Sequence, residues 1–146
     1  MQKNLYFIIF VTCLVVSVFT SLNAQPWIGD TWAYRRLITV TNPGSTVLTN
    51  YQVKITLDNT FNFAYANGDG SDIRITSVDG VTQIPFWIES WSQADQQATI
   101  WVKVPSIPVT GDSIFLYYGN PLATSASSAY HASFLPRQPK VIRRCR

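Results

Sequence analysis

The sequence predicts an all-β fold, an antiparallel β-sandwich that is jelly-roll-like, and three observations carry this prediction. Apolar and polar residues alternate along several short segments, which is the pattern of strands with one buried face. The three-to-four-residue spacing of an amphipathic helix is absent after residue 24. Clusters of Gly, Pro, Asn and Asp separate the segments at close spacing, as in β-sandwiches and barrels.

The expected strands can be followed in chain order. The first, in residues 32–42, is recognised by Leu37, Ile38 and Val40. In residues 51–58 every second residue from Tyr51 to Leu57 is apolar, and polar residues fill the other positions. Residues 61–67 leave two interpretations open, because the segment "FNFAYAN" suits either a strand or one helical turn that crosses between the sheets.

The later strands repeat the alternation. Ile73 and Ile75 share one face within residues 71–77. Two longer strands follow in residues 84–92 and 97–104, and residues 113–119 supply the last one. Each ends at a residue cluster whose backbone shape strands do not use, such as Asp79-Gly80 or Gly111-Asp112.

Residues 1–24 are expected to be a signal peptide and not part of the fold. Lys3 is followed by an apolar run from Leu5 to Phe19 and by a small, polar exit that ends at Ala24. The run is shorter than the roughly 20 residues that span a bilayer, although an uncleaved anchor is the alternative. We therefore expect a secreted, periplasmic or cell-surface protein that does not contact the membrane after cleavage.

Charge and cysteine content argue against a nucleic-acid-binding domain and against a fold stabilised by a disulfide. Between Gln25 and Ala129 there are five cations and eight carboxylates, so this part has a net charge of −3 and no basic stripe for a nucleic acid. The excess positive charge lies in residues 130–146, which contain five cations and no acid. After signal removal Cys145 is the only cysteine, so an intrachain disulfide is excluded.

The sequence predicts a sandwich domain over residues 25–122, followed by the start of a linker and a basic tail over residues 123–146. The segment "ATSASSA" is small and polar, and the tail after it shows no alternation. Two interpretations of the tail are open. The chain is a fragment of a longer protein or is read out of frame near its end, or the tail is natural.

Several quoted stretches resemble one known family. These stretches are "WAYRRLITVTNPG", "NYQVKITLD", "NGDGSDIRITSVDG", "IPFWIESW", "IWVKVPSIP" and "IFLYYGNP". In this order they are similar to the DUF2341 family, a domain of unknown function, from about Trp32 to Pro121. The resemblance implies an exported β-sandwich module within a larger surface protein, often followed by a concanavalin-like domain. It implies no activity.

Residues 84–104 predict a hairpin that contains three of the five tryptophans. The polar stretch between the two strands centres the turn near Ala94. The expected cross-strand pairs are Trp87–Trp101, Ile88–Ile100, Glu89–Thr99 and Trp91–Gln97. One face of this hairpin is apolar and belongs to the core. The other carries the candidate ligand-binding residues Trp87, Glu89, Trp91, Trp101 and Lys103.

Three functions of that face remain open. Indole rings at sheet spacing, with a carboxylate and an ammonium beside them, are suited to a polysaccharide. The indoles are equally suited to a cross-strand pair covered by the protein itself, or to a docking surface for a neighbouring domain of the parent protein.

We expect no enzymatic activity. His131 is the only histidine and lies in the tail, so the body offers no Ser-His-Asp or Cys-His arrangement. Glu89 is the only glutamate, and a glycoside hydrolase that uses it needs a second carboxylate about 5–10 Å away. The hairpin supplies none on that face, which leaves another strand as the alternative source.

One loop offers oxygens for a structural calcium ion. Asn67, Asp69 and Ser71 stand at alternate positions, and Asp72 adds a further carboxylate. The distal glutamate of an EF-hand is missing, so a simple Gly/Asp turn is the alternative. No other cofactor is expected.

Overall fold

The computed structural model describes residues 26–128 and 142–144. It contains seven strands and one short helix. They are β1 (Tyr34–Val40), β2 (Leu48–Leu57), η1 (Phe63–Tyr65), β3 (Arg74–Ser77), β4 (Phe86–Ser92), β5 (Gln97–Ile107), β6 (Asp112–Tyr118) and β7 (Ile142–Arg144). The predicted signal peptide and residues 129–141 and 145–146 of the predicted tail lie outside the described residues.

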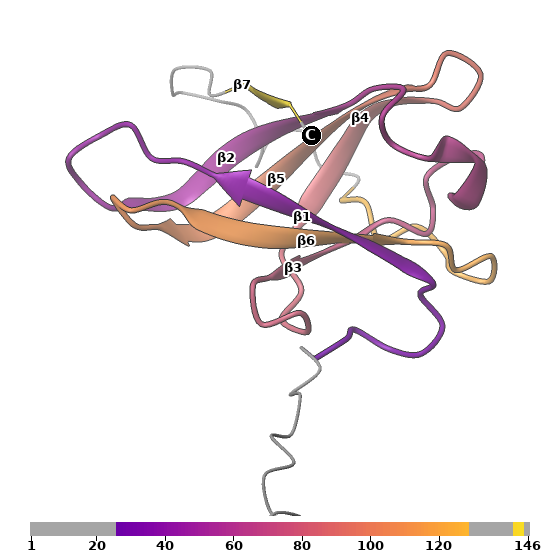
Figure 1. Cartoon of the computed structure of the whole chain (residues 1–146), viewed down its shortest axis with the longest axis horizontal. Helices are drawn as coiled ribbons and strands as arrows, with labels where there is room; N and C mark the ends of the chain where they lie inside the picture. Colours follow the sequence, from indigo (N-terminus) through magenta and orange to yellow (C-terminus); the bar gives the residue numbers. More distant parts are fainter. Residues whose placement is uncertain (1–25, 129–141, 145–146) are drawn as a thin grey trace, which may run out of the picture.

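The strands form two stacked sheets, which confirms the predicted all-β sandwich. One sheet has the order β1-β6-β3 and the other the order β4-β5-β2-β7 (Figure 1). Neighbouring strands are antiparallel except β7, which runs parallel to β2. β1 pairs with β6 and β2 with β5, like a long hairpin folded onto itself, which is jelly-roll pairing.

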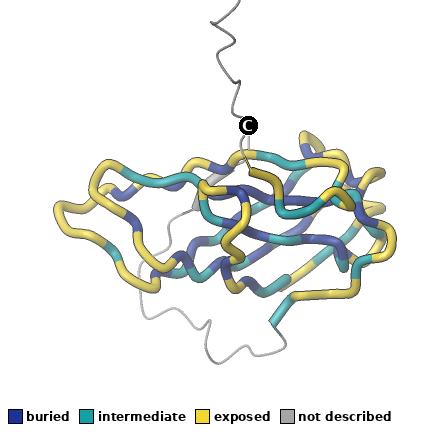
Figure 2. Tube along the Cα trace, turned by 90° about the horizontal axis from the view of Figure 1, so that it is seen from below, coloured by how far each residue is buried: buried dark blue, intermediate teal, exposed yellow. Residues whose placement is uncertain are grey.

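The core lies between the sheets and is built from the alternate apolar residues of the strands. In β2, Val53, Ile55 and Leu57 are buried, while the residues between them are only half-buried. In the neighbouring strand β5 of the same sheet, Ile100 pairs with Ile55 and Val102 pairs with Val53, and both are fully buried. Figure 2 shows the buried stretches inside the two layers and the exposed stretches in the loops at either end.

The segment that the sequence left open forms a helical turn. Residues 63–65 make one turn of 3-10 helix between β2 and β3, with Phe61 and Phe63 buried. Both rings contact the indole of Trp91, with ring centroids 6.1 Å and 5.2 Å apart. Among the described residues, no helix is long and apolar enough to cross a membrane.

Residues 123–128, which the sequence predicts to begin a linker, lie along the sandwich. The carbonyl of Thr124 accepts a hydrogen bond from Arg74 at 2.8 Å. Farther on, Ser128 N–H donates to the Phe86 carbonyl at 2.9 Å, and Ile88 N–H donates to Ser127 Oγ at 2.9 Å. This stretch therefore covers the edge of β4.

Candidate functional site

The predicted indole pair is present on the outer face of the four-stranded sheet. Trp87 of β4 lies directly opposite Trp101 of β5, and Ile88 lies opposite Ile100, so the predicted register is confirmed up to this point. Both indoles are half-buried, whereas Ile100 on the inner face is fully buried. The hairpin thus separates an apolar inner face from an outer face that carries the two rings.

Glu89 and a lysine from β2 fix the position of Trp101. The indole Nε1 of Trp101 donates a hydrogen bond to Glu89 Oε2 at 2.9 Å. Lys54 Nζ lies 3.9 Å from the same carboxylate oxygen and 5.7 Å from the centre of the Trp101 ring. The carboxylate, indole and ammonium therefore form one cluster, which we call the Trp101 cluster.

Lys54 was absent from the predicted site. Its position on the polar side of its strand is readable from the alternation in residues 51–58. Its place beside Trp101, however, depends on β2 being the neighbour of β5, and local patterns do not give strand order. Lys103 lies on the same outer face, opposite Gln52 of β2, and is half-buried.

The prediction that Trp91 shares this face is wrong. The register shifts between Ile88 and Ser90, so Glu89 is an extra residue and forms a β-bulge. Trp91 then pairs with Ala98 instead of Gln97, and Ser90 instead of Glu89 pairs with Thr99. Because the shift exchanges the two faces of the strand, Trp91 turns inward and packs against the core.

The inward ring of Trp91 fills space that Gly70 leaves open. A β-carbon at Gly70 would lie 2.8 Å from two ring atoms of Trp91. The Trp91 Nε1 is buried and has no hydrogen-bond partner among the described residues. The indole therefore serves as an apolar ring here, without a polar contact to present to a ligand.

The predicted calcium loop is ordered by its own hydrogen bonds. Asp72 is fully buried, and its carboxylate accepts the backbone N–H groups of Asn67, Gly119 and Asn120 at 2.9, 2.6 and 3.3 Å. The Asn67 side chain donates to Ser71 Oγ at 2.9 Å. These bonds join the loop to the end of β6 by using carboxylate oxygens that a cation would need.

Asp69, the fourth residue of that set, is exposed. A hydrogen bond from the Ser71 side chain, followed by one from its N–H, holds the pKa of Asp69 below its usual value. Within residues 26–128 and 142–144, no three His, Cys, Asp or Glu side chains gather in a way that suits a metal ion. Calcium binding by this loop stays a prediction.

The remaining tryptophans cover the outer face of the other sheet. Residues 26–33 form a segment, here called the N-terminal arm, that lies over β1, β6 and β3. Trp27 meets Tyr117 of β6 edge-on, with ring centroids 5.3 Å apart, and Trp32 Nε1 donates to the Asp72 carbonyl at 2.9 Å. Tyr117 is consequently fully buried although it points away from the core.

The guanidinium of Arg35 lies between two aromatic rings under this arm. Its Cζ is 4.4 Å from the Trp27 ring centre and 4.5 Å from that of Phe115. Its Nη1 donates to the Pro26 carbonyl at 2.9 Å and to the Tyr117 hydroxyl at 3.3 Å. No local pattern in the sequence indicates this covering arm.

Comparison with known families supports the resemblance for the later quoted stretches, from "NGDGSDIRITSVDG" onward, and not for the first two. A family model described as "Domain of unknown function (DUF2341)" matches residues 69–135. The chain resembles the DUF2341 family. The matched region begins in the loop before β3 and includes the whole β4–β5 hairpin with its bulge, so the Trp101 cluster lies largely within the DUF2341-like part. No curated protein and no solved structure matches the chain.

Proposed function

We propose that this chain is a non-catalytic extracellular module that binds a polysaccharide on the outer face of its four-stranded sheet. The observation that carries the proposal is the Trp101 cluster. There, an indole on a rigid strand is held by Glu89, and Lys54 lies over its ring. Trp87 lies directly opposite on the neighbouring strand and extends the aromatic surface.

The chemistry of this surface suits a sugar chain. Indole faces make apolar contact with the C–H faces of pyranose rings, while a carboxylate and ammonium groups hydrogen-bond to hydroxyls. Because Trp101 is already fixed by Glu89, little side-chain freedom is lost when a ligand binds. Lys103, two residues farther along β5, continues the row of polar partners on the same face.

A binding role fits this face better than acid–base chemistry. Glu89 accepts a hydrogen bond from an indole and lies next to an ammonium, so its carboxylate is already engaged by two groups of the protein. Within the described strands β2, β4 and β5, it is the only carboxylate. The paired carboxylates of a typical glycosidase are therefore not assembled from these strands.

Affinity electrophoresis on a panel of neutral and acidic polysaccharides tests the proposal. We expect at least one polysaccharide to retard the chain, and Trp101→Ala or Trp87→Ala to abolish the retardation. The matched control is Trp27→Ala, which removes an exposed indole from the opposite sheet and should leave the retardation unchanged. Circular dichroism on each variant verifies that the fold is retained.

Two results would contradict the proposal. A folded chain that no polysaccharide retards has no glycan-binding face. Loss of retardation in Trp27→Ala alone would place the binding site on the other sheet. If no polysaccharide retards the folded chain, acrylamide quenching tests the alternative that this face docks to a neighbouring domain. Trp87 and Trp101 should then be protected from the quencher in the parent protein and accessible in this chain.

A further inference from the structure

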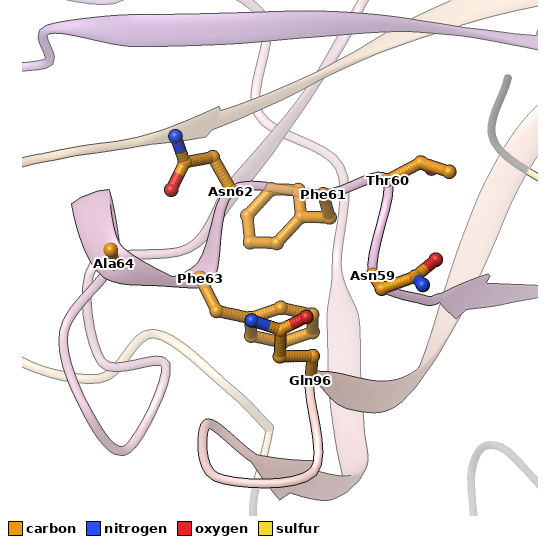
Figure 3. A pocket seen from close by; sticks show the side chains of 7 residues that line it. All are labelled: Asn59, Thr60, Phe61, Asn62, Phe63, Ala64 and Gln96. Carbon is orange, nitrogen blue, oxygen red and sulfur yellow. The ribbon is translucent and has the colours of Figure 1, made fainter.

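A cavity lies at one end of the sandwich, away from the Trp101 cluster. It is open to solvent, has a volume of about 260 Å³, and separates the β2–β3 connection from the turn of the β4–β5 hairpin (Figure 3). Its lining residues are Asn59, Thr60, Phe61, Asn62, Phe63, Ala64 and Gln96. None of these side chains carries a charge.

The lining combines hydrogen-bonding groups with two aromatic rings. Asn59, Asn62 and Gln96 are exposed, and each amide both donates and accepts hydrogen bonds. Thr60 adds a hydroxyl. The rings of Phe61 and Phe63 lie beneath these polar groups and are each only 2 % exposed, so they leave little surface for a ligand (Figure 3). The cavity therefore offers mainly neutral polar groups.

The β2–β3 side of the cavity is fixed by contacts behind it. The carbonyl of Thr60 accepts a hydrogen bond from Arg36 Nη2 at 2.6 Å, and its N–H donates to Asp58 Oδ1 at 3.0 Å. The rings of Phe61 and Phe63 lie edge to face, with centroids 4.9 Å apart. Ligand binding to a preformed wall costs little conformational entropy.

The turn side is tied to the same wall. Gln93 Nε2 donates a hydrogen bond to the Phe63 carbonyl at 2.8 Å, so the hairpin turn and the helical turn η1 are directly joined. Gln96 has φ of 52°, in the left-handed region that glycine and asparagine occupy more readily than glutamine. A strained residue whose side chain lines a cavity points to a function for that side chain.

We propose that this cavity binds a neutral polyhydroxylated ligand, namely a single sugar residue, independently of the Trp101 cluster. Sugar hydroxyls donate and accept hydrogen bonds, as the surrounding amides do. The volume is slightly below the roughly 300–1,000 Å³ of pockets for drug-sized ligands, which fits one pyranose and not a chain. The uncharged lining gives no compensation for an ionic ligand.

The test uses ligand-observed NMR and calorimetric titration of the full chain with methyl glycosides of neutral hexoses and pentoses. The methyl glycosides of the corresponding uronic acids serve as charged probes. We expect saturable, millimolar binding of at least one neutral glycoside and much weaker binding of its uronic acid counterpart. Gln96→Gly and Asn62→Ala should each weaken binding about tenfold, since each removes one or two hydrogen bonds.

Two controls separate the outcomes. Gln97→Ala changes a neighbouring exposed glutamine that does not line the cavity, and Trp101→Ala removes the other proposed site; both should leave glycoside affinity unchanged. Gln96→Gly relieves the left-handed strain, so its melting temperature should not fall, and weaker binding cannot be attributed to unfolding. The proposal is overturned if no glycoside binds, if uronic acids bind equally well, or if only Trp101→Ala removes binding.

Discussion

The outer faces of the two sheets carry similar residues but differ in how far these residues are covered. On the three-stranded sheet, Arg35 and Tyr117 lie under the N-terminal arm, and Tyr117 has no exposed surface. On the four-stranded sheet, Trp101 lies between Trp87 of β4 and Lys54 of β2, and both indoles are half-buried. Each face combines an indole with a cation, yet the chain's own arm covers the first.

The geometry of the cation distinguishes the two faces. Arg35 lies between two rings and donates hydrogen bonds to a carbonyl and a hydroxyl, so its planar group is enclosed on both sides. Lys54 lies over one ring and 3.9 Å from an exposed carboxylate. Among the described residues, Arg35 is thus enclosed by the arm and two rings, whereas Lys54 contacts one ring and one carboxylate.

The largest expected effect comes from displacing the arm. Gly80 has φ of 80°, and a β-carbon there would collide with the Pro26 carbonyl. Gly80→Ala should therefore reduce the free energy of unfolding by about 2–4 kcal/mol, through backbone strain and loss of the arm's packing. Urea denaturation followed by tryptophan fluorescence measures this change.

Gly68→Ala is the matched control for that substitution. The added β-carbon would lie 3.3 Å from the side-chain Oε1 of Gln93, farther than the contact at Gly80, and Gly68 is not among the residues with positive φ. We expect a change below about 1 kcal/mol. Equal losses in the two variants would show that the arm does not stabilise the sheet beneath it.

Replacing Arg35 or Lys54 should give the next largest difference in the free energy of unfolding. Arg35→Ala should reduce the free energy of unfolding by about 1–3 kcal/mol, because it removes stacking on two rings and a hydrogen bond to Pro26. Lys54→Ala should cost less than about 1 kcal/mol, since exposed ion pairs contribute little. Losses of the same size in both variants would contradict the distinction between the two faces.

The smallest effect concerns the turn beneath the arm. Hydrogen bonds from the Thr82 hydroxyl, then from the N–H groups of Thr82 and Val81 and the Ser77 hydroxyl, hold the pKa of Asp79 well below its usual 3.8. A carboxyl with a lowered folded-state pKa stabilises the fold above its unfolded pKa, and this contribution is lost as pH falls through the folded value. The stability of the protein should therefore decrease below about pH 4.

Asp79→Asn removes that titration. Thermal melts between neutral pH and pH 3 should show a shallower acid decline in the variant than in the unchanged chain. Identical slopes would mean that the turn is not held by the Asp79 carboxylate.

Much of the fold could be predicted because strand alternation is a local property. The burial of Ile100 and Val102 and the pairing of Trp87 with Trp101 follow from period-two patterns and one turn position. The resemblance to the DUF2341 family was likewise readable from short quoted stretches.

The features that could not be predicted depend on contacts between distant segments. The arm covers Tyr117 across 90 residues of chain, Lys54 reaches Trp101 only through the strand order, and neither leaves a local signal. The bulge at Glu89 is local, but its sequence reads equally well as a regular strand. The inward turn of Trp91 depends on the two phenylalanines of a separate loop that accept its ring.

The extra residue at position 89 determines which side chains of β4 face outward and which face the core. Side chains alternate along a regular strand, so residues 87 and 91 would share one face if β4 paired without a bulge. The extra residue instead lets β4 place Trp87 on the outer face and Trp91 in the interior against Phe61 and Phe63. A difference of one residue in strand length can in this way change the side chains on the outer face of such a domain, while the strands and their order stay the same.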